Sequence, residues 1–278
     1  RIGLIDEFDD IFAREASIVA STCVGISSRH ALKNLRYDWV IIDEAARATA
    51  PELLLPMLLG KKIILVGDHK QLPPIVNLVK DNNYTVKINQ KILEKSLFEE
   101  IFEKSEGGPA QKTLLSQFRM HSGISKLVND VFYPKYDIKT KTKDEDRIHN
   151  LGFTEQVIWL DTTYIKDNQE EAVNKSFRNK VESKLILRKL EEMNHIYKQK
   201  GIHSNVAIIS GYSAQKELLI NEINPENFKW SNIKIQIDNI DAFQGSEADI
   251  VFYSLVRSNE ENDIGFLKDE RRLNVALS

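Results

Sequence analysis

Two adjacent acids end a short apolar run. The string WVIID (39–43) leads directly to the pair Asp43 and Glu44. Neighbouring carboxylates repel each other, and burying either one is costly. One interpretation is that the strand reaches the surface there and the acids begin a helix, whose first turn favours negative charge. The other is that Asp43 helps to hold Mg²⁺ while Glu44 accepts a proton from a water that attacks a γ-phosphate.

A second polar cluster follows another apolar run, in ILVGDHKQLPP (64–74). Gly67 permits a tight turn, Asp68 can bind backbone groups or a metal-bound water, and Gln71 can orient a water or contact a phosphate. The alternative is a polar loop that only closes a strand. The length of the string, and its place after the first cluster, favour a functional loop.

The third cluster lies in LLSQFRMHSGISKLVNDVFY (114–133), where Arg119 precedes a helical pattern. An arginine in such a place can act as a finger on phosphate charge, an effect of ~10³–10⁵ in rate. Phe118 beside it offers a face on which an adenine could stack. The alternative is a surface ion pair next to a core aromatic residue.

The fourth cluster lies in NIDAFQGSEADIVFYSLVRS (239–258). Gly245 would let the backbone approach a ligand closely, and Gln244 and Glu247 supply hydrogen-bonding groups just before an apolar run. The alternative is a turn that precedes a buried strand.

Apolar runs and helical patterns alternate along the chain. The runs rich in Ile and Val predict strands at 17–22, 39–43, 62–68, 156–161, 205–210, 233–237 and 249–256. The helical patterns cover 51–59, 91–104, 122–132, 181–199 and 213–223. Apolar strands separated by helices favour parallel sheets covered on both faces, which is an α/β architecture. Ligands of such sheets bind outside the carboxyl ends of the strands, where three of the four clusters lie.

Composition limits the function classes. A length of 278 residues allows roughly two domains, and 42% hydrophobic and 28% charged residues are ordinary for globular proteins. The net charge of −3 gives no general attraction to nucleic acid, so such a site must be a local groove. The single cysteine excludes an internal disulfide framework and suits a cytoplasmic location. The apolar stretches are too short for a membrane helix, which predicts no membrane partner.

The break between domains is expected where glycine and proline interrupt the pattern, in KSEGGPAQK (104–112). We therefore predict a first domain over 1–107 and a second over 108–278. The polar stretch 135–147 predicts a surface loop.

Taken together, the strings resemble one family. DEAA, GDHKQLPP, SLFE, QFRMH, DAFQGSEADIV, VRS and GFLKDERRLNVALS occur in the order found in superfamily 1 helicases, and they look most like the up-frameshift-like branch. The resemblance extends from STCVG at residue 21 to residue 278. It implies two RecA-like domains, each a mostly parallel sheet flanked by helices, with ATP between them.

The resemblance assigns roles to residues of the nucleotide site. Asp43 and Glu44 match motif II, the Mg²⁺ carboxylate and the water-activating acid. Gln71 matches the motif III glutamine that contacts the γ-phosphate. Arg119 matches the arginine finger of motif IV, and Phe118 takes the place of an adenine-stacking tyrosine.

Further roles follow from motifs Ic, III and V. Gly245 and Glu247 match motif V, where the glutamate reaches the nucleotide sugar. Asn239 stands where a threonine is common, which weakens its assignment. The residues assigned to the nucleic-acid track are Ser21, Thr22 and Val24 of motif Ic, with His69, Pro73 and Asn239.

Two departures from the family pattern stand out. The sequence holds no G-x-x-x-x-G-K-[S/T] string, and Gly60-Lys61-Lys62 is the nearest approach. Motif VI stops at Ser278, before its second arginine. We therefore expect a fragment whose first domain is incomplete at its N-terminus and which is inactive by itself.

The sequence thus predicts the motor core of an ATP-dependent, Mg²⁺-dependent helicase or translocase that moves along single-stranded DNA or RNA, 5′ to 3′ by resemblance. One alternative is a non-catalytic nucleic-acid-binding module. Another is a nucleoside-triphosphate-driven switch that remodels protein partners.

Overall fold

The computed structural model describes residues 11–75, 95–226 and 229–278. The chain divides into two compact units, Arg1–Lys112 and Thr113–Ser278. The boundary predicted from Gly107 and Gly108 lies five residues before this division. Each unit has its own sheet and its own hydrophobic core.

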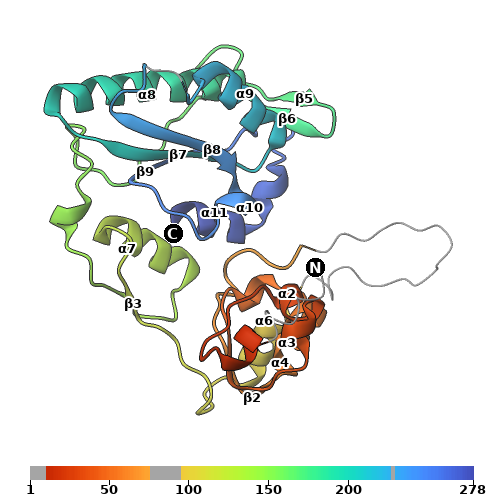
Figure 1. Cartoon of the computed structure of the whole chain (residues 1–278). Helices are drawn as coiled ribbons and strands as arrows, with labels where there is room; N and C mark the ends of the chain where they lie inside the picture. The colour runs from red at the N-terminus through yellow and green to blue at the C-terminus, as the bar shows by residue number, and fades with distance from the viewer. Residues whose placement is uncertain (1–10, 76–94, 227–228) are drawn as a thin grey trace, which may run out of the picture. The chain divides into compact units, whose positions relative to one another are not determined.

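The first unit is built on two parallel strands. β1 (Tyr37–Ile42) pairs with β2 (Gly60–Leu65), and α4 (Ala50–Met57) makes the crossover between them. α4 begins where its sequence favours it, because Thr49 and Glu52 form a reciprocal capping box. The unit also contains α2 (Cys23–Ser28), α3 (His30–Lys33), the one-turn η1 (Ala45–Arg47) and α6 (Leu97–Lys104) (Figure 1).

The core of this unit lies on one face of the two strands. Val40 and Ile42 of β1 pack with Ala45, Ala46, Leu53 and Phe98. The alternate residues Trp39 and Ile41 are 54% and 66% exposed. Among the described residues, therefore, only one face of this sheet is covered, whereas cover on both faces is expected of a parallel sheet.

The second unit contains a three-stranded parallel sheet in the order β8-β7-β9. The strands are β7 (Ser204–Ser210), β8 (Ile233–Asn239) and β9 (Ile250–Ser254). Figure 1 shows α8 (Lys180–Lys200) and α9 (Ser213–Ile223) along one face, and α10 (Ile240–Phe243) and α11 (Glu270–Leu277) at the other. Side chains of β7 are buried on both faces: Val206 and Ile208 lie in one cluster, Ala207 and Ile209 in another.

The other elements of the second unit are short apart from α7 (Ser122–Phe132). β3 (Ser116–Gln117) pairs in parallel with β4 (Lys139–Thr140). β5 (Glu171–Val173) and β6 (Ser176–Arg178) form an antiparallel hairpin. η2 (Asp144–Arg147) and η3 (Gly265–Lys268) are single turns.

Several sequence predictions are confirmed. The α/β class is correct, and helices α7 and α9 begin and end at the predicted residues. α6 starts at Leu97 rather than at 91, because Ser96 caps it by accepting a hydrogen bond from the Glu99 amide; residues 91–94 lie outside the described residues.

Three predictions are wrong. Residues 17–22 form no strand; Ile18 is 88% exposed, and Thr22 instead caps α2. The apolar segment 156–161 pairs with no strand of the described chain, and Trp159 is 75% exposed. The stretch 135–147 is not wholly loop, since it contains β4 and η2. Apolar content alone does not make a strand when no neighbour offers it a ladder of hydrogen bonds.

Within the described residues, no helix combines the length and apolar character that a bilayer span demands.

Candidate nucleotide and nucleic-acid site

The acids after β1 lie on an exposed turn at the carboxyl end of the strand. Asp43 Oδ1 accepts a hydrogen bond from the Glu44 amide at 2.9 Å, and Glu44 has a left-handed backbone with φ of 52°. The Ala45 amide then donates to the Val66 carbonyl at 2.8 Å, so the turn is pinned to the end of β2. Both acids are exposed. They end the strand at the surface, without the cost of buried charge.

The turn after β2 touches the turn after β1. A Cβ added to Gly67 would lie 2.9 Å from the Ala46 amide nitrogen, so only a glycine allows the two turns to pack this closely. The Asp68 carboxylate accepts from the Lys70 amide at 2.9 Å, and the Gln71 amide donates to the Asp68 carbonyl at 3.2 Å. Motifs II and III, as predicted from the sequence, therefore lie beside each other in the first unit.

The donor set at this edge can be compared with what Mg²⁺ requires. Asp43 is exposed, and no cluster of three or more His, Cys, Asp or Glu side chains that could hold a metal occurs in the part of the chain that the structure describes. Mg²⁺ is usually held by one or two carboxylates, phosphate oxygens and waters rather than by an all-protein cage. One accessible carboxylate beside a nucleotide fits that pattern.

The residues assigned to the nucleic-acid track of the first unit are in two places. Ser21, Thr22 and Val24 surround the start of α2, and the Thr22 hydroxyl accepts from the Gly25 amide at 3.0 Å. All three are exposed, as a backbone contact would require. His69 instead packs on Phe102, with ring centroids 4.8 Å apart, and Pro73 is half-buried. His69 is thus partly engaged by the protein itself.

In the second unit a tight turn carries Phe118 and Arg119. The side-chain oxygen of Gln117 accepts from the amides of Arg119 and Met120, both at 2.8 Å, and its nitrogen donates to the Met120 carbonyl at 3.0 Å. The Phe118 ring is 70% exposed. The predicted alternative, a core aromatic residue, is therefore wrong, and an exposed ring is free to stack on a base.

Arg119 lies next to the predicted motif V. Its Nε is 3.7 Å from Glu247 Oε2, and its Nη1 donates to the carbonyl of Ser278 at 3.3 Å. Both side chains of the ion pair are substantially exposed, so the pair itself contributes little to stability. Gly245 has φ of 79°, in the region that favours glycine, and the space around its missing Cβ is open. The structure thus gathers motifs IV, V and VI in one unit.

Asn239 sits at the end of β8, opposite Ser210 of β7. It precedes α10 without capping it through its side chain, and its Oδ1 is buried with no hydrogen-bond partner among the described residues. A buried side-chain oxygen without a hydrogen-bond partner is unusual, and a water molecule would satisfy it as well as a ligand.

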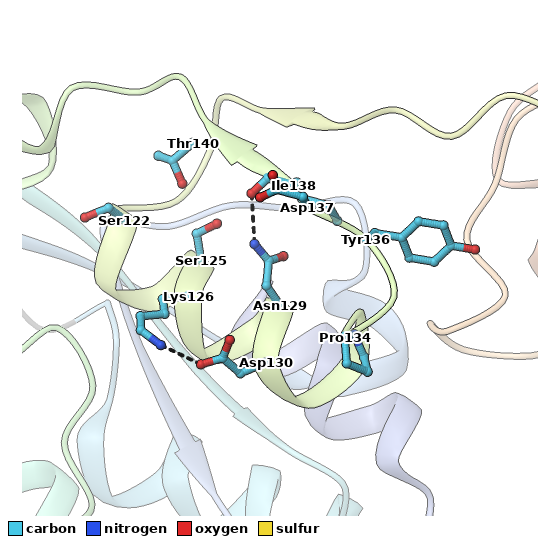
Figure 2. A pocket seen from close by; sticks show the side chains of 10 residues that line it. All are labelled: Ser122, Ser125, Lys126, Asn129, Asp130, Pro134, Tyr136, Asp137, Ile138 and Thr140. Carbon is cyan, nitrogen blue, oxygen red and sulfur yellow. Dashed lines mark hydrogen bonds and ion pairs between the residues drawn. The ribbon is translucent and has the colours of Figure 1, made fainter.

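A polar pocket of about 260 Å³ lies elsewhere in this unit, between α7 and the segment after it (Figure 2). Its charged groups are already paired: Lys126 with Asp130 at 2.7 Å, and Asp137 with Lys139 at 2.5 Å. None of the predicted site residues lines it. It is therefore separate from the candidate site.

Sequence reasoning missed several residues that hold the site. Gln117 forms the turn that carries Arg119. Asn274 of α11 donates to the Tyr133 hydroxyl at 2.7 Å, which joins α11 to the end of α7.

Two further features of the second unit were also missed. Arg257 and Glu170 form an ion pair of 2.8 Å whose side chains are each 8% exposed. The hairpin β5–β6 was also missed, although Asn174, with φ of 54°, is a typical hairpin-turn residue.

Comparison with known proteins identifies the family of the chain. A family described as AAA domain matches residues 93–278, and a second, also described as AAA domain, matches residues 5–78. The chain is 34% identical over 273 residues to a regulator of nonsense transcripts 1 homolog of Drosophila melanogaster, covering 95% of this chain and 22% of the relative.

Two further relatives come from Schizosaccharomyces pombe. The chain is 30% identical over 276 residues to the ATP-dependent helicase upf1 and 33% identical over 302 residues to the DNA replication ATP-dependent helicase/nuclease dna2. These matches cover 95% and 98% of this chain but 28% and 20% of the relatives, so the chain spans about a quarter of the length of such proteins. With the AAA domain match over 93–278, they show that the chain belongs to the superfamily 1 helicases of the up-frameshift-like branch.

Proposed function

We propose that the chain is the motor core of an ATP-dependent helicase or translocase that acts on single-stranded nucleic acid. The observation that carries the proposal is the close packing of the turn bearing Asp43 and Glu44 against the turn bearing Gly67 and Gln71. This packing brings Asp43, Glu44 and Gln71 to one edge of the sheet, where nucleotides bind in α/β proteins. In the proposal, these residues are the metal carboxylate, the general base and the amide that contacts a phosphate.

Each residue has a distinct role in the proposal. Asp43 would hold Mg²⁺, which neutralises charge on the phosphates when bound. Glu44 accepts a proton from the attacking water, and Gln71 contacts the γ-phosphate. Arg119 stabilises the charge that develops on the transferred group, and Phe118 stacks on the adenine.

Glu247 is proposed to hydrogen-bond the nucleotide sugar, with Gly245 allowing the backbone to approach. ATP would then contact residues of both units, in a cleft whose opening and closing moves the strand. The proposal also requires a phosphate-binding loop, and this sequence holds no G-x-x-x-x-G-K-[S/T] string.

The strand would run over Ser21, Thr22, Val24, His69, Pro73 and Asn239. These groups suit phosphate and sugar more than base edges, which is why either DNA or RNA is proposed. The 5′ to 3′ direction is carried over from the family resemblance. A cytoplasmic location is proposed from the single cysteine.

Strand-stimulated hydrolysis tests the function. We expect the full-length protein to release phosphate from ATP several-fold faster when single-stranded DNA or RNA of mixed sequence is added at low salt. Equal rates with and without either strand would refute the helicase and favour a switch acting on proteins. Strand binding without any hydrolysis would instead favour a binding module.

A further inference from the structure

The connection between β9 and α11, here called the β9–α11 loop (255–269), links two predicted motifs. It leaves β9 after motif V and delivers α11, the helix of motif VI. The C-terminal end of α11 reaches Arg119, because the Ser278 carbonyl accepts from the Arg119 guanidinium at 3.3 Å. The position of this loop therefore bears on the arginine proposed to act on phosphate charge.

Arg257, the third residue after Ser254, contacts the loop from the inside. Its Nε lies 2.8 Å from Glu170 Oε1, an ion pair without hydrogen-bond geometry, and its Nη2 donates to Asp263 Oδ2 at 3.1 Å. The guanidinium also lies over the Phe177 ring at 4.4 Å. With its side chain only 8% exposed, Arg257 joins the hairpin segment, where Glu170 and Phe177 lie, to the far side of its own loop.

The backbone at the loop's first turn is strained. Val256 is fully buried and has φ of 71°, which is a genuine outlier for a β-branched residue. Its amide donates to Glu182 at 2.9 Å, and its carbonyl accepts from Asn179 at 3.1 Å. Such a conformation persists only where the surroundings impose it, and it is found most often at functional sites.

The loop then closes over the Arg257 head group. A Cβ on Gly265 would lie 2.3 Å from Arg257 Nη1, so the loop packs directly on the guanidinium. The Phe266 ring packs against Tyr212 at 5.6 Å, and Arg272 of α11 lies over Phe266 at 5.2 Å. A continuous series of contacts thus runs from Arg257 to α11.

We propose that Arg257 is a positioning residue for the motor reaction: paired with Glu170, it fixes the β9–α11 loop and thereby holds α11 against the Arg119 turn. The inference rests on the proposed function, since positioning has a catalytic consequence only if Arg119 acts on the nucleotide. Lysine cannot replace arginine here, because a point charge cannot reach Glu170 and Asp263 while lying flat on Phe177.

The test uses Arg257→Lys in the full-length protein, since lysine keeps the buried charge. We expect the strand-stimulated kcat for ATP to fall about tenfold, with KM for ATP within about twofold, because small misplacements of catalytic groups cost rate. Hydrogen exchange should become faster in peptides covering 259–277.

Arg178→Lys is the matched control. Arg178 belongs to the same hairpin and pairs with Glu171, but it is 34% exposed, and none of its hydrogen bonds or ion pairs within the described chain reaches the β9–α11 loop. We expect wild-type kcat and wild-type exchange in this variant. Unchanged kcat and unchanged exchange in Arg257→Lys would overturn the inference, as would a kcat that falls only in proportion to the folded fraction.

The two proposals can fail separately. If the wild-type protein shows no strand-stimulated hydrolysis, the proposed function fails, and exchange at 259–277 alone decides whether Arg257 positions α11. If the wild-type protein is active and Arg257→Lys retains its rate, only the positioning inference fails.

Discussion

At the scale of single residues, the two acids after β1 contribute differently to the turn that ends the strand. Asp43 accepts from the backbone of its neighbour, whereas the left-handed conformation of Glu44 turns the chain away from the strand. A non-glycine residue in that conformation is uncommon and is enriched at functional turns.

Replacement of Glu44 by glutamine should abolish ATP hydrolysis in the full-length protein while nucleotide binding is kept, because the amide cannot accept the proton of the attacking water. Phosphate release, with binding of a fluorescent ATP analogue, measures the two effects. Asp38→Asn is the control, since Asp38 belongs to the same strand and pairs with Lys61 at the surface. A normal rate in Glu44→Gln would remove Glu44 from the mechanism.

Glu182 gives a prediction about pH. Burial raises the pKa of its carboxyl above the usual 4.5, against the hydrogen bonds from Ser254 and Val256 that lower it. The folded state therefore binds the Glu182 proton more tightly than the unfolded state does. The protonated carboxyl contributes its full stability below about pH 4.5, and this contribution is lost as pH rises through the raised pKa of the folded state.

Glu182→Gln should flatten this decline, because the amide stays uncharged and its oxygen can still accept from the Val256 amide. Urea unfolding between pH 4 and pH 8 measures the slope. Glu191→Gln, at an exposed ion pair with Lys229, should leave the slope unchanged. An identical slope in Glu182→Gln and the wild type would contradict the assignment.

At the scale of elements, sequence pattern predicted helices best. α7 and α9 were placed correctly from their apolar periodicity, although α9 has no side-chain cap at its N-terminus. α8 was placed within one residue at each end, and there Asn179 accepts from the amides of Val181 and Glu182. The segments 17–22 and 156–161 were misread, because strands depend on neighbours that local sequence does not reveal. The buried pair of Arg257 and Glu170 joins residues 87 positions apart, which no local pattern can indicate.

The packing of the two turns in the first unit predicts a cost for Gly67→Ala. The new methyl group would lie 2.9 Å from a backbone nitrogen, which cannot move as a side-chain end can. We expect a loss of about 1–3 kcal/mol in the free energy of unfolding, as for other overpacked sites. Gly211→Ala is the control, since nothing lies within 4 Å of its added Cβ. Equal stability of the two variants in urea would contradict the close approach.

At the scale of the whole molecule, the family and the class of chemistry could be predicted from the order of the motifs, and the AAA domain matches agree. The structure adds which residues lie next to each other within each unit: Ala45 and Ala46 beside Gly67, and Arg119 beside Glu247. Which residues lie next to each other depends on long-range packing, which residue types alone do not determine.

The charge balance of the whole chain predicts how it binds strands. With a net charge of −3, affinity must come from local backbone contacts, which release counterions. Binding of the full-length protein to single-stranded DNA should therefore weaken steeply between 50 mM and 200 mM salt, as fluorescence anisotropy would measure. A flat response would contradict a track that contacts phosphates.

The contact between Gly67 and Ala46 has a mechanical consequence. The two turns are in van der Waals contact, and the Ala45 amide donates a hydrogen bond to the Val66 carbonyl. Neither turn can therefore move relative to the other without breaking this hydrogen bond. A displacement of the turn that carries Gln71 would then also displace the turn that carries Glu44. If Gln71 and Glu44 act as proposed, the side chain that contacts the γ-phosphate and the side chain that activates the water would move together.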